Sequence, residues 1–517
     1  MKQGPAANFI EKLQNPALYD HPVRGFRVIE THISWVLLTG PYAYKIKKPV
    51  NLGFLDFSTL DKRRHYCEEE LRLNQRLAPE IYLAVIPITG SAAAPALGGH
   101  GPVIDYAVKM REFPQDAQLD RVLARGELTA AQIIALAREI AQFHDRAAVA
   151  AADSPFGGAE EVWQPAGENF AQIRPHLDAE EDRSLLETLR GWSLQTHARL
   201  ADEWQQRKRG GFIRECHGDM HLGNMAWVDG KVLIFDCIEF NEHLRWIDVM
   251  SETAFVTMDL YDRGRPGLAH RLLNDYLQHS GDYAGLRVLR FYEVYRALVR
   301  AKVACLRLAQ SGLSEDERNG IRRHYRQYLR LAERYTHSVP TPLIITHGLS
   351  GSGKTTISDA LLESSGAIRI RSDVERKRLF GLAPEARSGS GIASGLYDLD
   401  ATVRTYERLA ALARTVITAG FPVIIDAAFL KERQREQFHR LADELRVPFV
   451  IFHCSASPEQ LRVRLQHRKA LARDASEATL QVLEHQLATQ EPLRADEATR
   501  IFTIDTGASL QEPQPPA

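Results

Sequence analysis

The chain has 517 residues, which is too long for one ordinary hydrophobic core, so two or three domains are expected. Hydrophobic residues make up 44% and charged residues 25%, the composition of an ordinary globular protein. The formal net charge of −1 excludes an overall attraction to nucleic acid or acidic membranes, although it leaves room for a local basic groove.

Signals for export and for disulfides are both missing from the sequence. The five cysteines are scattered and contain no CxxC pair, so we expect neither a disulfide framework nor a zinc site. The N-terminal sequence MKQGPAANFIEKLQ lacks the apolar stretch of a signal peptide. The longest apolar runs, such as Ile33–Leu38, have the length of a strand and not of a membrane span. We therefore expect a cytoplasmic protein.

The first part of the chain is predicted to begin with a sheet. Beta-branched and aromatic residues dominate Phe26–Lys48, which predicts short strands. A charged helical stretch follows over Leu60–Leu77, and Val103–Phe113 is typical of another strand. Thr129–Arg146 has the apolar spacing of an amphipathic helix, with Thr129 as its N-cap.

A linker and a second pattern follow. Helical spacing from Arg287 to Tyr335 stops at Ser338-Val-Pro-Thr-Pro342, where two prolines favour an extended linker. Strands and helices then alternate, with strands in LIITHG, AIRIRSD, FPVIIDAAF, PFVIFHCS and IFTID, which predicts a parallel sheet with crossover helices. We expect domains over residues 1–337 and 343–507, a linker over 338–342 and a disordered tail over 508–517.

The first chemical motif lies at the start of the second domain. Gly348-Leu-Ser-Gly-Ser-Gly353-Lys354-Thr355 matches GxxxxGK[ST] in full, after an apolar strand and before a helical segment. Such a loop turns backbone N–H groups toward phosphate oxygens, its lysine reaches the β- and γ-phosphates, and its threonine holds Mg²⁺. A chance glycine-rich turn is disfavoured by this context. The predicted nucleotide-binding residues are Gly348, Ser350, Gly351, Ser352, Gly353, Lys354, Thr355 and Thr356.

From about Pro342 to Asp505 the chain resembles small P-loop kinases of the polynucleotide-kinase, zeta-toxin and gluconate-kinase type. In these enzymes a D-x-x-R after the second strand supplies a base and a substrate-binding arginine, which implies these roles for Asp373 and Arg376. A helix N-cap is the alternative for Asp373. Asp426, at the end of the strand VIID, would hold Mg²⁺ or its water.

The same resemblance extends to an arginine-bearing lid. The segment from Arg462 to Arg468 implies that Arg464 and Arg468 close on the transferring phosphate, and a solvated helix face is the alternative. We also expect a substrate loop over Arg387–Asp400.

The second motif is His217-Gly-Asp219-Met-His-Leu-Gly-Asn224, followed by a strand that ends at Asp236. It resembles the catalytic loop and the metal-binding Asp of aminoglycoside and choline phosphotransferases, which are distant relatives of protein kinases. The resemblance implies that Asp219 accepts the proton of an acceptor hydroxyl, while Asn224 and Asp236 hold Mg²⁺. A loop capped by Asp and Asn is the alternative.

Such a domain also needs a strand lysine for the α- and β-phosphates and a helix glutamate that orients it. We prefer Lys45, in the A-x-K pattern, over Lys47 on the same strand face. We prefer Glu70 over its neighbours Glu68 and Glu69.

Three further positions complete this resemblance. Met110–Phe113 is expected to form the hinge, His144 to be structural, and Asp248 to brace the catalytic loop. The sequence departs from the family in lacking a GxGxxG loop between the first strands.

Taken together, we predict an α+β two-lobed protein-kinase-like domain followed by an α/β P-loop kinase domain with a parallel sheet. The whole chain resembles bacterial fusions of an aminoglycoside-phosphotransferase-like domain with a P-loop kinase. Each half is expected to use ATP and Mg²⁺ to phosphorylate a hydroxyl of a small molecule. The alternative is that only the P-loop half is catalytic, on a small molecule or on a 5′-hydroxyl of a polynucleotide, beside a regulatory or substrate-binding pseudokinase. Nucleic acid is disfavoured because that half has no stripe of aromatic and basic residues.

Overall fold

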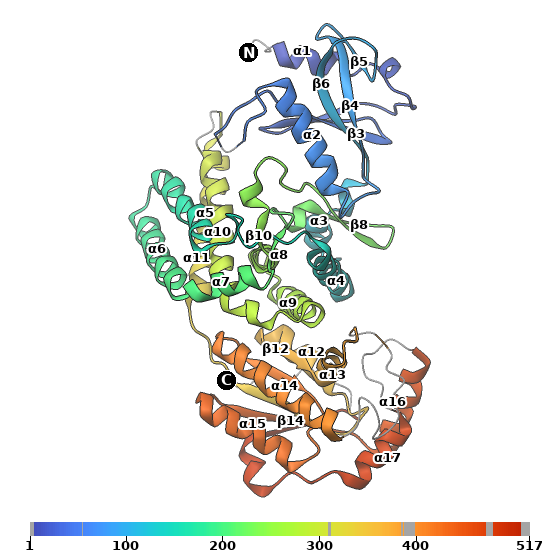
Figure 1. The fold of residues 1–517 in the computed structure, drawn as a ribbon, viewed down its shortest axis with the longest axis vertical. Helices are drawn as coiled ribbons and strands as arrows, with labels where there is room; N and C mark the ends of the chain where they lie inside the picture. The colour runs from blue at the N-terminus through green and yellow to red at the C-terminus, as the bar shows by residue number, and fades with distance from the viewer. Residues whose placement is uncertain are drawn as a thin grey trace. The chain divides into compact units, whose positions relative to one another are not determined.

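The computed structural model describes residues 5–53, 55–308, 312–383, 386, 399–471 and 479–507. The chain forms two compact units that interleave along the sequence. Figure 1 traces the chain in colour from the N-terminus to the C-terminus. The first unit consists of Met1–Ala135, Phe143–Val162 and Trp204–Val256. The second consists of Leu136–Gln142, Trp163–Glu203 and Thr257–Ala517. Among the described residues, no helix has the length and apolar character needed to cross a membrane.

The first unit is built on an antiparallel sheet with the strand order β1-β2-β3-β6-β4-β5. The predicted strands in Phe26–Lys48 and Val103–Phe113 are confirmed. The strands are β1 (Arg27–Glu30), β2 (Ser34–Leu38), β3 (Tyr42–Lys47), β4 (Tyr82–Ser91), β5 (Ala94–Leu97) and β6 (Val103–Arg111). β4 and β5 were not predicted, because β4 contains Pro87 and Gly90, residues that usually interrupt a strand. The register of β4 against β6 shifts twice, between Tyr82 and Ala84 and between Ile88 and Thr89.

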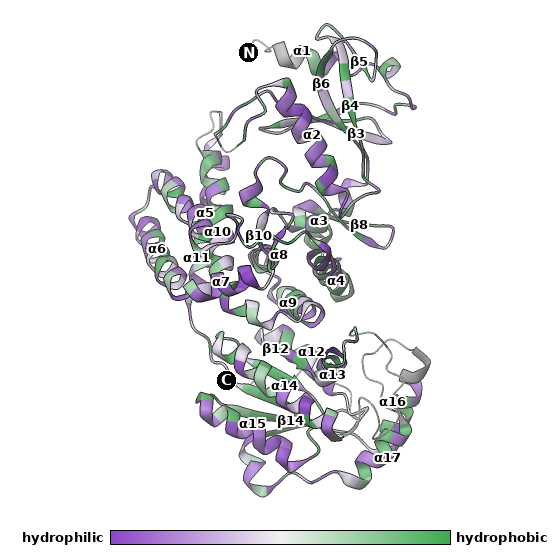
Figure 2. Ribbon diagram, viewed as in Figure 1, coloured by the Kyte–Doolittle hydropathy of each residue, from purple (hydrophilic) through white to green (hydrophobic). Residues whose placement is uncertain are grey.

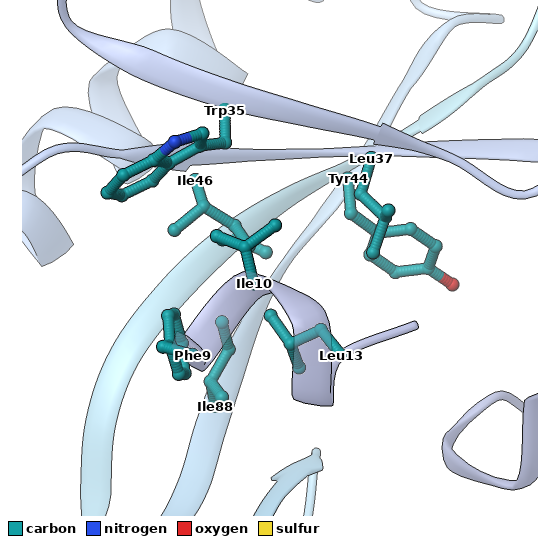
Figure 3. Packing of buried hydrophobic residues seen from close by; sticks show 9 residues of the cluster. Phe9, Ile10, Leu13, Trp35, Leu37, Tyr44, Ile46 and Ile88 are labelled. Carbon is teal, nitrogen blue, oxygen red and sulfur yellow. The ribbon is translucent and has the colours of Figure 1, made fainter. Parts of the chain in front are cut away.

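The two faces of this sheet bury different side chains. One face packs against helix α1 (Pro5–Lys12), as Figure 3 shows, and the other packs against helix α2 (Leu60–Asn74). The α1 face buries Phe9, Ile10, Leu13, Trp35, Leu37, Tyr44, Ile46, Ile88 and Ala107. Because side chains alternate along a strand, Ala43, Lys45 and Lys47 of β3 point to the opposite face, toward α2.

The rest of the first unit carries the motif around Asp219. That motif lies between β7 (Ile213–Glu215), which pairs with β10 (Trp246–Asp248), and the hairpin of β8 (Met225–Val228) and β9 (Lys231–Ile234). The hairpin turns at Asp229-Gly230, where both residues have positive φ, as a tight two-residue turn requires. Around it lie α3 (Leu119–Ala124), part of α4 (Ala130–Arg146), α7 (Ala201–Arg209) and the first half of α8 (Val249–Asp262).

The second unit contains a helical layer and the P-loop sheet. The helical pattern over Arg287–Tyr335 forms two packed helices, α10 and α11. The helices of this layer are α5 (Ala159–Ile173), α6 (Glu180–Arg199), α9 (Pro266–Ser280), α10 (Leu286–Leu308) and α11 (Glu315–Thr336).

The predicted parallel sheet is confirmed, with the order β12-β13-β11-β14-β15. All five predicted strands are present: β11 (Leu343–His347), β12 (Ile368–Arg371), β13 (Val423–Asp426), β14 (Phe449–Ser455) and β15 (Ile501–Asp505). The helices between them are α12 (Lys354–Ser365), α13 (Ser372–Leu379), α14 (Leu399–Thr418), α15 (Glu432–Leu445), α16 (Pro458–Leu471) and α17 (Leu480–Thr489). Figure 2 shows β14 as mainly hydrophobic and α15 as largely hydrophilic, as expected for a sheet buried under amphipathic helices. The glycine loop and Ser372 follow the carboxyl ends of β11 and β12, and Asp426 is the last residue of β13, at the edge where ligands bind in such sheets.

Candidate active sites

The first unit contains a cavity of about 500 Å³. Ala43, Met110 and Phe113 give it an apolar wall, and the last two lie in the segment predicted as the hinge. Lys45, Asp219, Asp236 and Glu239 also line the cavity and bring charge to it. An apolar slot with a few convergent charged groups suits a ligand with a flat base and an anionic tail.

Lys45 is the centre of the charged groups. Its Nζ lies 2.6 Å from Asp236 Oδ1 and 2.8 Å from Glu70 Oε1. Glu70 has no solvent-exposed surface. The other two candidates are engaged elsewhere, since Glu68 pairs with Arg64 and Glu69 with Arg72. The structure therefore brings together the three residues that the sequence selected for one site.

Lys47, the competing lysine, belongs to the same cluster. Its Nζ lies 2.6 Å from Glu70 Oε2 and also contacts Glu239. One glutamate thus serves two lysines of one strand. Burial would raise the pKa of Glu70, but Lys45 and Lys47 outweigh it and hold that pKa below its usual range. Although burial opposes it, the nearby carboxylates raise the pKa of both lysines, so Glu70, Lys45 and Lys47 are charged at neutral pH.

The loop around Asp219 is tied to the strand that leads to Asp236. Asn224 Nδ2 donates to the carbonyl oxygen of Asp219 at 3.0 Å and to its Oδ2 at 3.1 Å. Phe235 N donates to Asn224 O, and Ile238 N donates to His217 O. Asp219 and Asn224 therefore lie together, and the bonds of the loop run to both sides of Asp236.

Two residues of this site have positive φ. Gly218 has φ +90°, and a Cβ there would lie 2.7 Å from Leu244 O, so only glycine fits. Asp236 has φ +65°, which is uncommon for a residue with a side chain and is found where the surroundings impose it. Its backbone N–H donates to Tyr82 Oη at 3.1 Å.

From the sequence, Asp248 is expected to brace the loop around Asp219, but the structure gives this role to Glu252. Asp248 accepts hydrogen bonds from Arg207 and from Met250 N at the start of α8. Glu252, one turn further on, accepts from His217 N at 2.8 Å and from Gly218 N at 2.7 Å. The prediction failed because Asp248 ends β10 and Glu252 lies in the first turn of α8, and their spacing alone does not decide which of them faces the loop.

His144 supports this brace, in agreement with the structural part expected of it. Its Nε2 lies 2.9 Å from Glu252 Oε2, and both side chains are buried. Burial would raise the pKa of Glu252, but the hydrogen bond and charge of His144, the nearby His217 and the backbone N–H of Gly218 together outweigh it and lower that pKa. Glu252 is therefore an ionised acceptor for the loop.

Replacing Glu252 by glutamine is expected to destabilise the first unit. A neutral amide cannot accept from both loop N–H groups and His144 as a carboxylate does, and buried donors left unsatisfied cost about 1–3 kcal/mol. Thermal unfolding should therefore occur at a lower temperature. Glu242→Gln is the matched control, because its side chain is 64% exposed. Equal unfolding temperatures for Glu252→Gln and the wild type would contradict the bracing role.

The second site is the glycine loop after β11. Gly348 has φ +146°, and a Cβ there would lie 2.4 Å from Cys454 O, so the close turn depends on glycine. Lys354, the first residue of α12, donates through Nζ to Gly348 O at 2.9 Å and to Leu349 O at 2.8 Å. Ser350 N donates to Gln486 Oε1 of α17 at 2.9 Å. The loop has the closed turn and the lysine of a phosphate cradle.

Asp426 lies beside this loop. Ser358 Oγ of α12 is 3.2 Å from Asp426 Oδ2 and 3.0 Å from Thr355 O. One serine hydroxyl therefore connects the two residues predicted to hold Mg²⁺. Asp426 is 6% exposed and its carboxylate also lies 4.0 Å from Arg371 Nε.

The D-x-x-R pair lies on α13. Asp373 is in the first turn of the helix, whose N-cap position is Arg371, so the capping alternative does not describe it. Asp373 Oδ1 lies 3.7 Å from Arg376 Nη1. The structure thus brings these two residues together after β12, which β13 separates from the strand that leads into the glycine loop.

The arginines of the predicted lid segment make different contacts. Arg464 donates to Gly351 O at 3.3 Å and to Thr506 Oγ1 at 3.0 Å, so it contacts the outer backbone of the glycine loop. Arg462 pairs with Glu484. The side chain of Arg468 and most of the predicted substrate loop, residues 387–398, lie outside the described residues.

Several contact residues were not predicted from the sequence. Glu239, Glu252 and Ser358 all contact residues of the motifs. For the two acids a signal exists, because each stands among apolar residues, in CIEF and VMSETAFV. A charge in such a run is buried only with partners, so it points to a structural or functional contact.

Two family models match the chain. The model described as "Phosphotransferase enzyme family" matches residues 61–292, and the model described as "AAA domain" matches residues 343–493. Relatives of nearly the same extent include "Uncharacterized protein Rv2004c" of Mycobacterium tuberculosis (strain ATCC 25618 / H37Rv) and "Uncharacterized protein Mb2027c" of Mycobacterium bovis (strain ATCC BAA-935 / AF2122/97). Each is 30% identical over 467 residues, covering 88% of this chain and 89% of the relative.

Solved structures similar to each half include several kinases. Amicoumacin kinase hAmiN, in complex with AMP-PNP, Ca²⁺ and Ami, is 14% identical with a TM-score of 0.41, and the match covers 64% of this chain and 96% of that one. A gluconokinase from Sinorhizobium meliloti 1021 is 22% identical with a TM-score of 0.23, and the match covers 35% of this chain and 86% of that one.

Proposed function

The chain belongs to the family of these mycobacterial proteins and is an ATP-dependent phosphotransferase, and from this premise we propose that both halves are working kinases. Each transfers the γ-phosphate of ATP to a hydroxyl of a small molecule. The observation that carries the proposal is that each half has its own lysine and acid. Lys45 pairs with Asp236 in one half. In the other half Lys354 lies against the glycine loop, and Ser358 connects Asp426 to Thr355. We assign residues 1–337 and 343–507 to the two kinase domains and 338–342 to the linker.

In the first site, some residues position the nucleotide and the metal, and one residue accepts a proton. Lys45, oriented by Glu70, neutralises charge on the phosphates. Asn224 and Asp236 offer the amide and carboxylate oxygens that Mg²⁺ prefers, so the donor set fits this ion. Asp219, held by Asn224, accepts the proton of the acceptor hydroxyl. Mg²⁺ and ATP, when bound, would supply positive charge and the phosphoryl group.

In the second site the backbone of Gly348–Thr355 receives the phosphates and Lys354 leaves its carbonyl partners to neutralise them. Thr355 and Asp426 hold the metal, which fits their hard oxygen donors. Asp373 orients the acceptor hydroxyl and Arg376 binds an anionic group of the substrate. In both sites most of the rate enhancement comes from positioning and electrostatics.

The alternative of a regulatory first half is disfavoured by a specific observation. Degenerate kinases commonly lose the lysine, the base or a metal ligand, whereas Lys45, Asp219, Asn224 and Asp236 are all present here, with Lys45 paired to Asp236 and Asn224 bonded to Asp219. Fusion of two active kinases also raises the local concentration of any intermediate that they share, which favours consecutive steps on one substrate.

The test follows label from γ-³²P ATP into a small-molecule extract and into an oligonucleotide with a free 5′-hydroxyl. In a chain that carries Lys354→Ala, so that only the first site works, label is expected in small molecules. Adding Lys45→Met should reduce it by about 10²-fold or more, because phosphate charge is no longer neutralised. Lys48→Met is the matched control, since Lys48 pairs with Glu30. Labelling of the oligonucleotide by the wild type, or retention of label by Lys45→Met, would overturn the corresponding assignment.

A further inference from the structure

Helix α9, which lies outside the P-loop segment of the chain, covers the edge strand β12 of the parallel sheet. Asn274 Oδ1 accepts from Arg369 N at 2.7 Å, and Asn274 Nδ2 donates to Ala367 O at 3.1 Å. The side-chain amide thus pairs with the β12 backbone as a neighbouring strand would, and Asn274 is 3% exposed.

The same helix also contacts α12, the helix that follows the glycine loop (Figure 1). His270 Nδ1 lies 2.8 Å from Glu363 O near the C-terminal end of α12. A Cβ at Gly366 would come within 2.9 Å of the His270 ring, so the close approach depends on a glycine. α9 is therefore fitted to the P-loop domain by specific contacts and not only by apolar packing.

A series of ion pairs connects α9 to α12 and to the strand β12. Asp359 of α12 accepts from two arginines, Arg271 of α9 and Arg369 of β12, the latter at 2.7 Å. Arg271 Nη2 lies 2.7 Å from Glu363 Oε1 as well. Arg271 is 8% and Arg369 is 6% exposed, so both guanidinium groups depend on these partners.

This series of contacts ends beside Asp426 and Thr355, the predicted metal ligands. Arg369 Nη1 donates to Ser358 Oγ at 3.3 Å, and Ser358 has no solvent-exposed surface. An arginine has only donors, so the serine accepts from it and directs its own hydrogen to Asp426 or to Thr355 O. Asp359, shared between two arginines, keeps Arg369 beside Ser358.

We infer that Ser358 and Arg369 are positioning residues for Asp426, and that Arg271 of α9 holds them in place from outside the P-loop domain. This inference rests on the proposed function of Asp426 as a ligand of Mg²⁺. It makes the metal affinity of the second site depend on the helical layer of the first half. Partners of metal-binding carboxylates commonly change metal affinity when they are removed.

The test uses the full chain with Asp236→Asn, which removes a proposed metal ligand of the first site. Binding of a fluorescent ADP analogue is measured with Mg²⁺ and with EDTA, and the part lost in Lys354→Ala is assigned to the second site. Ser358→Ala and Arg271→Met should each weaken the Mg²⁺-dependent affinity by about tenfold, with less effect in EDTA. Ser364→Ala is the matched control, because Ser364 lies on α12 and its hydroxyl bonds only its own helix.

The outcomes separate two claims. If no binding depends on Lys354, the proposed function of the second site fails. If binding depends on Lys354 and on Mg²⁺ but Ser358→Ala and Arg271→Met behave like Ser364→Ala, the positioning inference is wrong. A folded Ser358→Ala variant whose affinity falls equally with Mg²⁺ and with EDTA would also overturn it. Ser358→Ala, a small change inside a helix, decides the matter if Arg271→Met does not fold.

Discussion

Replacing Lys354 by alanine is expected to lower phosphotransfer by the second site by about 10²–10³-fold and to leave transfer by the first site intact. Lys354 is the single lysine of the glycine loop, and its Nζ already lies against the loop, 2.9 Å from Gly348 O. No other cation of the motif can take over the charge that develops on the transferring phosphate. The measurement is the rate of label transfer to each acceptor, with both acceptors taken from the small-molecule extract.

The control for this variant is Lys431→Ala in the same domain. Lys431 is 37% exposed in its side chain and pairs with Glu491, so its loss should leave both transfer rates close to those of the wild type. A Lys354→Ala chain that still phosphorylates both acceptors would show that the glycine loop does not supply a catalytic site.

Asp219→Asn is expected to lower the turnover of the first site by about 10²–10⁴-fold, the usual contribution of a general base. The substitution keeps the size of the side chain and removes only its ability to accept the proton. Asn224, which donates to Asp219 O as well as to its carboxylate, should still hold the loop. The KM for ATP should therefore change far less than turnover, which separates proton transfer from nucleotide binding.

Asp229→Asn is the matched control for this prediction. Asp229 lies in the nearby hairpin turn at φ +50°, a conformation that asparagine adopts readily. Its turnover should match that of the wild type. Equal turnover of Asp219→Asn and the wild type would mean that the first half transfers phosphate without this base, or that it transfers none and the observed activity belongs to the second site.

Local patterns predicted the parallel sheet, and the resemblance to a kinase family supplied the residues proposed for the first site. The five strands of the second domain are apolar runs between helical segments, and all five were found. The resemblance to two kinase families and the fold class it implied were confirmed by the family matches. Lys45 was selected from the A-x-K pattern and Glu70 from the face of its helix, and the structure places the two side chains 2.8 Å apart.

The remaining features depend on contacts between distant segments. β4 was missed because Pro87 and Gly90 resemble loop residues, and only its pairing with β6 makes it a strand. Asp248 was predicted as the brace and Glu252 was found in that role, because packing sets the rotation of α8 relative to the loop. The link from Arg271 to Asp359 spans 88 residues, so no local spacing could have predicted it.

The central claim is that one chain carries two independent sites for a nucleoside triphosphate. Equilibrium binding of a non-hydrolysable ATP analogue with Mg²⁺ counts these sites directly. We expect two per wild-type chain, one in Lys354→Ala, one in the Lys45→Met variant, and none in the double variant. A single site in the wild type that disappears with Lys354→Ala alone would contradict the account.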